Sequence, residues 1–170
     1  MSFETVLFYI LAVVSIGSGI LVITRRSPVM SVLYLILNFF ALAGLYLTLH
    51  AQFIAVIQII VYAGAIMVLF LFVIMLLNLG DEQKLSERVS FRKMTAVGLS
   101  FAVLMELVYI VLVREEEFPV KNIERAVEIG SVEHIGKELF STFLFPFEVT
   151  SVLLIAAIVG AVVLAKRKFD

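Results

Sequence analysis

The chain has 170 residues, of which 62% are hydrophobic and only 16% charged, and its mean hydropathy is +1.13. A soluble domain of this length needs a larger polar fraction to cover its surface, so the composition indicates an integral membrane protein. The net charge of −1 gives no general attraction for nucleic acid, and the lack of cysteine excludes disulfides, ordinary iron–sulfur clusters and thiol catalysis.

Five apolar stretches are long enough to cross a bilayer, whose hydrocarbon core of about 30 Å takes about 20 helical residues. We therefore expect an all-α membrane protein with five transmembrane helices in a single domain, residues 1–170, without internal repeats. The first stretch has no basic start and no small-residue cleavage site, so we do not expect a cleavable signal peptide. The predicted helices cover residues 3–23, 29–49, 53–77, 94–113 and 143–165.

The connections between these helices predict their orientation. Ser27 and Pro28 form a typical N-cap followed by proline in the first turn of the second helix. Basic residues mark the cytoplasmic side of a membrane protein. The 24–27 turn, the 80–93 loop and the tail hold nine of the 13 basic residues, and five crossings place all three on one side. We therefore expect a cytoplasmic C-terminus, an N-terminus outside (periplasmic), and the long acidic loop 114–142 between the fourth and fifth helices outside as well.

The end of this outer loop has a helical pattern. Ile135, Leu139 and Phe143 recur every four residues among polar side chains. This spacing predicts an amphipathic helix that lies on the membrane surface before Pro146 begins the last span. An ordinary helix in a soluble loop explains the pattern equally well.

Polar residues inside the apolar stretches are candidate functional residues, because such groups usually face protein or water. Asn38 shares a stripe with Tyr34 and Ala41, and its simplest role is a hydrogen bond between helices. Glu106 follows Gly98 and Ala102 at four-residue spacing. That face predicts a protein contact for Glu106, while snorkelling of its side chain to the nearby surface is the alternative.

Glu148 follows Pro146 and Phe147, and we expect it in the first turn of the last helix. An acid at that position is favoured by the helix dipole and by unpaired backbone amides. The alternative is a role in a proton path, and both roles are compatible with one residue.

Tyr62 lies roughly 14 Å inside the third stretch, where its hydroxyl needs a hydrogen-bond partner. Gln58 is one α-helical turn earlier, so a local polar patch is expected. The run from Ala63 to Ala65, with Gly64 between them, removes side-chain bulk beside the tyrosine. A static, tight helix crossing accounts for these residues as well as a moving element does.

The sequence also resembles a known family. The two segments that carry the resemblance are QIIVYAGAIMVLFLFVIMLLNLG and ELFSTFLFPFEVTSVLLIAAIVGAVVLAKR. Together they resemble the subunit J (chain 6) family of NADH:quinone oxidoreductase, which is respiratory complex I. The likeness covers nearly the whole chain, except that residues 114–133 show no family pattern.

The resemblance implies a non-catalytic subunit of a proton-translocating enzyme in the bacterial inner (cytoplasmic) membrane. Its expected partners are the membrane subunits H, A and K. It implies no redox centre in this chain, since NADH, flavin mononucleotide (FMN), the iron–sulfur clusters and the quinone are held by other subunits.

The resemblance further implies a π-bulge in the third helix and a rotation of that helix that opens or closes a water path for protons. Tyr62 and Gly64 match the tyrosine and glycine of the family's bulge. The bulky residues expected to plug or clear the path are Ile66, Met67, Val68 and Phe70.

Three other interpretations remain open from the sequence. The first is a related subunit of a multisubunit sodium–proton antiporter or membrane-bound hydrogenase. The second is a stand-alone small transporter or channel, although the missing repeat and the scarcity of buried charge weigh against it. The third is an assembly subunit in which the Tyr62 stretch is static packing.

Overall fold

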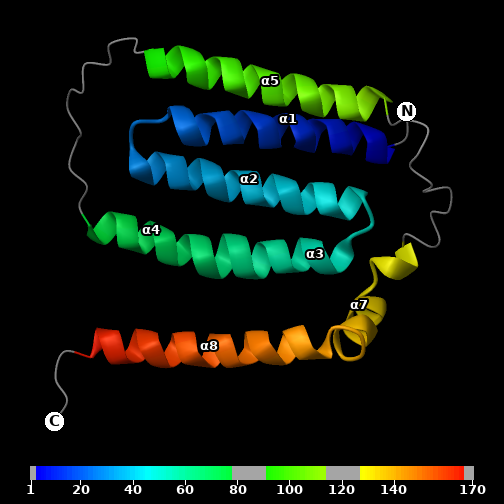
Figure 1. The fold of residues 1–170 in the computed structure, drawn as a ribbon, viewed down its shortest axis with the longest axis vertical. Helices are drawn as coiled ribbons and strands as arrows, with labels where there is room; N and C mark the ends of the chain where they lie inside the picture. The colour runs from blue at the N-terminus through cyan, green and yellow to red at the C-terminus, as the bar shows by residue number, and fades with distance from the viewer. Residues whose placement is uncertain (1–2, 78–90, 114–126, 167–170) are drawn as a thin grey trace.

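The computed structural model describes residues 3–77, 91–113 and 127–166, and these ranges contain helices and no strands (Figure 1). Most of the basic loop, the run Glu115–Glu117 and the end of the basic tail lie outside the described residues. Four helices are long and apolar enough to cross a membrane. They are α1 (Phe3–Thr24), α2 (Pro28–Thr48), the continuous helix Gln52–Leu76 and α8 (Leu144–Ala165).

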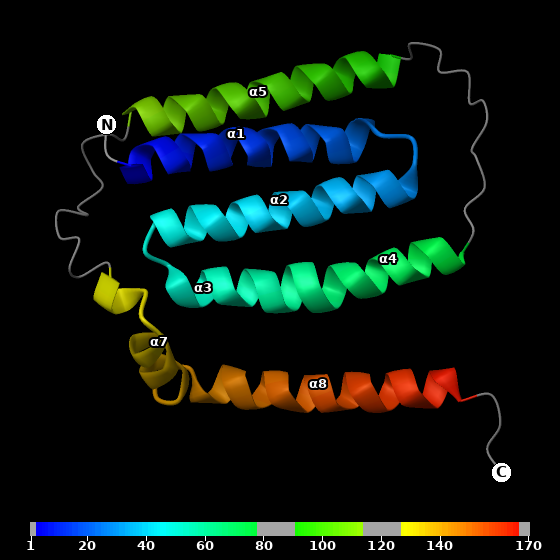
Figure 2. The same ribbon diagram turned by 180° about the vertical axis from the view of Figure 1, so that it is seen from behind.

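The remaining long helix is α5, Phe91–Val113. Within its described side chains the apolar part, Thr95–Ile110, is shorter than a membrane span. The long helices alternate in direction along the chain, as Figures 1 and 2 show from opposite sides.

The packed part of the molecule is a layer of three antiparallel helices with α2 in the middle (Figures 1 and 2). Ala41 and Ala43 are buried, and a Cβ placed on Gly44 would lie only 2.8 Å from Leu11 Cδ1 of α1. These small residues therefore let α2 approach its neighbours closely, as expected for helices in lipid. Neither α5 nor α8 packs extensively on this layer among the described residues.

The turn between α1 and α2 ends at the predicted position. Ser27 has an extended backbone with φ −81° and ψ 119°, and Pro28 is the first helical residue. The Ser27 side chain makes no capping hydrogen bond, while its carbonyl accepts from the Ser31 N–H at 3.0 Å. Within the turn, the Arg25 guanidinium lies 5.5 Å from the centre of the Tyr34 ring.

The turn between α2 and α3 is closed by His50, whose φ is +59°. The Ala51 N–H donates to the Tyr46 carbonyl at 2.9 Å and the His50 N–H to the Leu47 carbonyl at 3.1 Å. This is the Schellman pattern of a helix end, with histidine at the left-handed position that glycine usually fills. The turn folds the third helix back against α2 within three residues.

The amphipathic helix predicted before the last long helix is present as α7, Val132–Leu139. The Ser131 hydroxyl caps it by accepting from the His134 N–H at 3.2 Å. The side chains of Ile135 and Leu139 are partly buried, and α7 contacts α3. Its place at a membrane surface stays a prediction.

Candidate functional site

The third long helix changes its hydrogen-bonding pattern in its middle. It consists of α3 (Gln52–Ile57), a π-helical segment η1 (Gln58–Ile66) and α4 (Met67–Leu76). At the end of η1 the Met67 N–H donates to the Tyr62 carbonyl, five residues earlier. The π-helical geometry implied by the family resemblance is therefore present, and it extends over nine residues. Such segments are rare and are frequent at functional sites.

The buried face of this helix shows the effect of the π segment. Ala55, Gln58, Ala63 and Met67 are buried, and all of the other described residues of the helix are more exposed. Gln58 and Ala63 are five residues apart, whereas neighbours on one face of an α-helix are three or four apart. One extra residue is therefore accommodated, and Ala63 takes the buried position next to Gln58 on that face.

Tyr62 is turned away from the centre of the buried face. It is 46% exposed, and its ring meets Phe39 of α2 edge to face, with the ring centres 5.8 Å apart. The expected polar patch of Tyr62 with Gln58 is not formed in this π-helical register. Gln58 is 7% exposed, and no hydrogen bond joins it to Tyr62 in the described part of the chain. The prediction assumed α-helical spacing, in which residues four apart share a face.

Gly64 is close to its own helix. A Cβ at this position would lie 3.2 Å from the Ile59 carbonyl oxygen, and no other atom outside the local backbone would lie within 4 Å. Ile59 is five residues earlier, so the contact results from the π register. The static alternative was a tight crossing with another helix, and the described residues form no such crossing at Gly64. The small residue of η1 that is buried is Ala63.

The four bulky residues that follow do not act as one group. Met67 is buried, whereas Ile66, Val68 and Phe70 are each close to half exposed. Only Met67 therefore extends the line of Gln58 and Ala63. The other three face outward from this chain.

Asn38 joins α1 to α2, as the sequence predicts. Its side-chain nitrogen lies 2.6 Å from the Ser15 carbonyl oxygen and 3.1 Å from the Ser18 hydroxyl, which both accept. Ser18 is buried and donates in turn to the Ser15 carbonyl at 3.0 Å. We call these three residues the Asn38 network. It fixes the rotation of α2, and Phe39 is the next residue along that helix.

The two candidate acids lie outside this site. Glu106 on α5 and Glu148 on α8 are both exposed, and neither helix packs extensively on η1. The expected position of Glu148 in the first helical turn is wrong, since α8 begins at Leu144. Pro146 is the third helical residue, where its missing N–H leaves no hydrogen bond unmade. Glu148 is therefore in the second turn, where the helix dipole favours it less.

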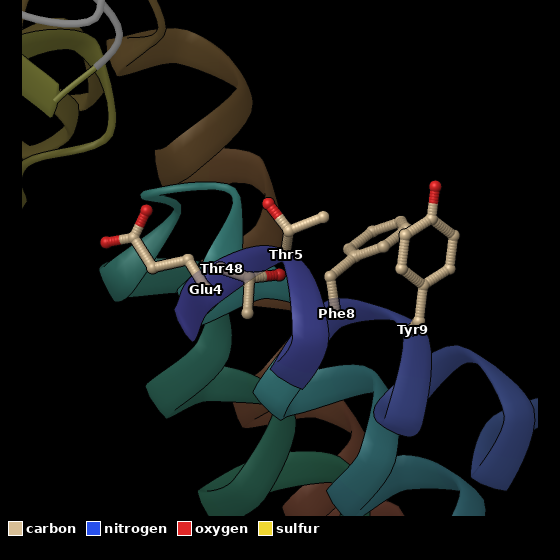
Figure 3. Close-up of a pocket in the computed structure, with 5 residues that line it drawn as sticks. All are labelled: Glu4, Thr5, Phe8, Tyr9 and Thr48. Atoms are coloured by element: carbon tan, nitrogen blue, oxygen red, sulfur yellow. The ribbon is translucent and has the colours of Figure 1, made fainter. Parts of the chain in front are cut away.

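A shallow surface hollow lies at the end of the α1–α2 pair where α1 begins and α2 ends (Figure 3). It is lined by Glu4, Thr5, Phe8, Tyr9 and Thr48. The Glu4 carboxylate and the Tyr9 hydroxyl point away from each other in Figure 3. None of the candidate site residues lines this hollow.

Three residues of the site were missed by sequence reasoning. Phe39 is one of many apolar residues in α2, and nothing in its sequence context distinguishes it. Ser15 and Ser18 were detectable, because hydroxyl residues three apart in the middle of an apolar helix are typical partners for a polar residue on a neighbouring helix.

Comparisons with known proteins relate the chain to one family. Residues 18–164 match the family described as NADH-ubiquinone/plastoquinone oxidoreductase chain 6. The chain is 34% identical to NADH-quinone oxidoreductase subunit J of Buchnera aphidicola, covering 95% of this chain and 97% of that protein. It is 37% identical to the Escherichia coli K12 protein of the same name, over 91% and 82% of the two chains. NAD(P)H-quinone oxidoreductase chain 6 of a Nostoc strain is also 37% identical, over 98% and 81%.

Proposed function

The chain belongs to the NADH-ubiquinone/plastoquinone oxidoreductase chain 6 family, and we propose that its third helix controls a proton path in the membrane arm of that enzyme complex. In this proposal the subunit carries no redox centre. NADH, FMN, the iron–sulfur clusters and the quinone are bound by other chains, and subunits H, A and K are its neighbours in the bacterial inner membrane.

Five crossings are the topology that we propose for the chain. The 23 residues of α5 span about 35 Å as an α-helix, which is enough for a bilayer once its polar ends are included. The alternating directions of the long helices then put the start of α1 and the end of α8 on opposite sides (Figure 1). With the basic residues inside, α7 and the loop before it are outside.

One observation carries the proposed control of the proton path, namely the five-residue step between Gln58 and Ala63 on the buried face. If the five-residue hydrogen bonds of η1 were replaced by four-residue ones, the segment would become α-helical and the extra residue would no longer be accommodated in it. Each residue of an α-helix turns it by about 100°, so Tyr62 would take the place of Ala63 and Ile66 that of Met67. A small side chain beside α2 would thus be exchanged for a large one. Such an exchange changes the space that water can occupy between the helices.

The rest of the layer supplies a fixed reference for this rotation. The Asn38 network ties α2 to α1, and Gly44 lets the same two helices approach closely. The π segment, in contrast, meets α2 through its buried face at Ala63 and through the Tyr62 ring. These contacts are apolar and have no fixed hydrogen-bond partner, so a rotation breaks no polar bond between the two helices.

The direct test of membership is purification of the native complex through a tag on this chain, followed by mass spectrometry of its subunits. We expect the NADH-binding and quinone-binding subunits of an NADH:quinone oxidoreductase to be present. Recovery of sodium–proton antiporter or hydrogenase subunits instead would favour the related complexes. Recovery of an active homo-oligomer would favour a stand-alone transporter.

A further inference from the structure

Gln58 is a buried amide without a hydrogen bond in the described part of the chain. Its side chain is 7% exposed, at the start of the π segment. No described polar atom is both fully enclosed and unpaired, so the amide group reaches the edge of the buried face. Asn38, the amide between α1 and α2, is by contrast fully engaged through its nitrogen. Burying an unpaired amide is unfavourable, and more so in lipid.

The π register is what separates Gln58 from its nearest polar neighbour. Tyr62 is four residues later, and residues four apart lie about 40° apart around an α-helix, on the same face. Side chains of a helix lean toward its N-terminus, so Tyr62 would then extend back over the turn that holds Gln58. In the π segment the position facing α2 belongs to Ala63 instead, and the Tyr62 ring contacts Phe39.

We propose that Gln58 is the hydrogen-bond partner that Tyr62 gains when η1 becomes α-helical. The Tyr62 hydroxyl donates to the Gln58 side-chain oxygen in that register, so each side chain gains a hydrogen-bond partner inside the membrane. In the π register the tyrosine ring packs on Phe39 and the amide stays unpaired. Gln58 is thus a positioning residue that sets the balance between the two registers. This inference rests on the proposed rotation of the third helix.

The test compares Gln58→Met, Tyr62→Phe and the double variant in the purified native complex. Methionine keeps the length of the side chain and removes the amide, and phenylalanine keeps the ring that contacts Phe39. Electron cryomicroscopy during turnover gives the ratio of α-helical particles, with residue 62 at the buried position after Gln58, to π-helical particles, with residue 63 there. Gln52→Met is the matched control, because Gln52 is an exposed glutamine at the start of the same helix.

We expect each single variant to lower the share of the α-helical register, changing the ratio by about two- to tenfold for one hydrogen bond. The double variant should change it no further, because either substitution already removes the shared bond. The control should match the wild type. Additive effects, or an unchanged ratio in Gln58→Met, would overturn the inference. Tyr62→Phe supplies the same test should Gln58→Met fail to assemble, since an unchanged ratio there excludes a bond from the hydroxyl.

The outcome also distinguishes this inference from the proposal on which it rests. If Gly64→Val changes the ratio of registers while Gln58→Met does not, the helix rotates without help from Gln58. If only one register is found in the wild type and in every variant, the rotation itself is disproved.

Discussion

Gly64→Val places a β-branched side chain where the π register leaves little room. The Cβ alone would stand 3.2 Å from the Ile59 carbonyl oxygen, and valine adds two methyl groups to it. Overpacking of this kind costs about 1–3 kcal/mol. Because Ile59 is five residues earlier, its carbonyl meets residue 64 closely only in the π register, so most of the cost falls on that register.

An unequal cost of about 1–3 kcal/mol changes the balance between two states by about five- to 150-fold. A cycle that must pass through both registers then slows. We therefore expect the mutant complex to assemble and to oxidise NADH at the wild-type rate with an artificial acceptor in the peripheral arm. Its quinone reduction coupled to proton pumping should fall severalfold. Gly64→Ala, which adds the Cβ alone, should have a smaller effect in the same direction.

Both activities are measured on the same purified complex, with Gly98→Val as the control. Gly98 lies on α5, where an added Cβ meets no described atom within 4 Å. Wild-type rates for Gly64→Val in both assays would mean that Gly64 is ordinary packing and that the third helix controls no proton path. A complex that fails to assemble with Gly64→Val but not with Gly98→Val would favour the interpretation as an assembly subunit.

Three further predictions test the topology and the polar residues. The chain has no cysteine of its own, so an impermeant thiol reagent on intact cells should label Glu133→Cys and not Lys166→Cys; labelling of residue 166 alone would reverse the orientation. Glu148→Gln should leave assembly and most coupled turnover intact, because this residue lies in the second turn of α8 and away from η1; an intact complex with severely impaired pumping would assign it to a proton path. Asn38→Leu removes the hydrogen bonds between α1 and α2, each worth about 0.6–1.7 kcal/mol in a membrane, and should lower the melting temperature of the complex. Ser100→Ala removes a hydrogen bond within one helix and is the control. Equal melting temperatures of the two variants would mean that the Asn38 network does not stabilise the complex.

The long helices could be predicted from the sequence because the length of an apolar run is a direct consequence of bilayer thickness. The predicted stretch 143–165 starts within one residue of α8, but the turn that holds Glu148 was counted from Pro146. Proline was taken to mark the beginning of the helix, but it is tolerated throughout the first turn, so Leu144 and Phe145 precede it within the helix. The position of Glu148 was wrong as a consequence.

The π segment could not be derived from the residues alone. Almost every residue from Ile59 to Leu76 is apolar, so no alternation of polar and apolar residues marks which face is buried. Gln58 is the one strongly polar residue near the middle of the helix, and α-helical spacing paired it with Tyr62. The family resemblance supplied the π geometry, and the structure supplied the contact with Phe39 and the burial of Ala63.

The rotation of the third helix is tested most directly by electron cryomicroscopy of the intact complex at rest and during turnover with NADH and quinone. The feature to be compared is the pair of residues of the third helix that lies on its buried face, against α2. We expect two populations, one with Ala63 and Met67 on that face and one with Tyr62 and Ile66, whose ratio changes on turnover. A single π-helical register under both conditions, in a complex that pumps protons, would contradict it.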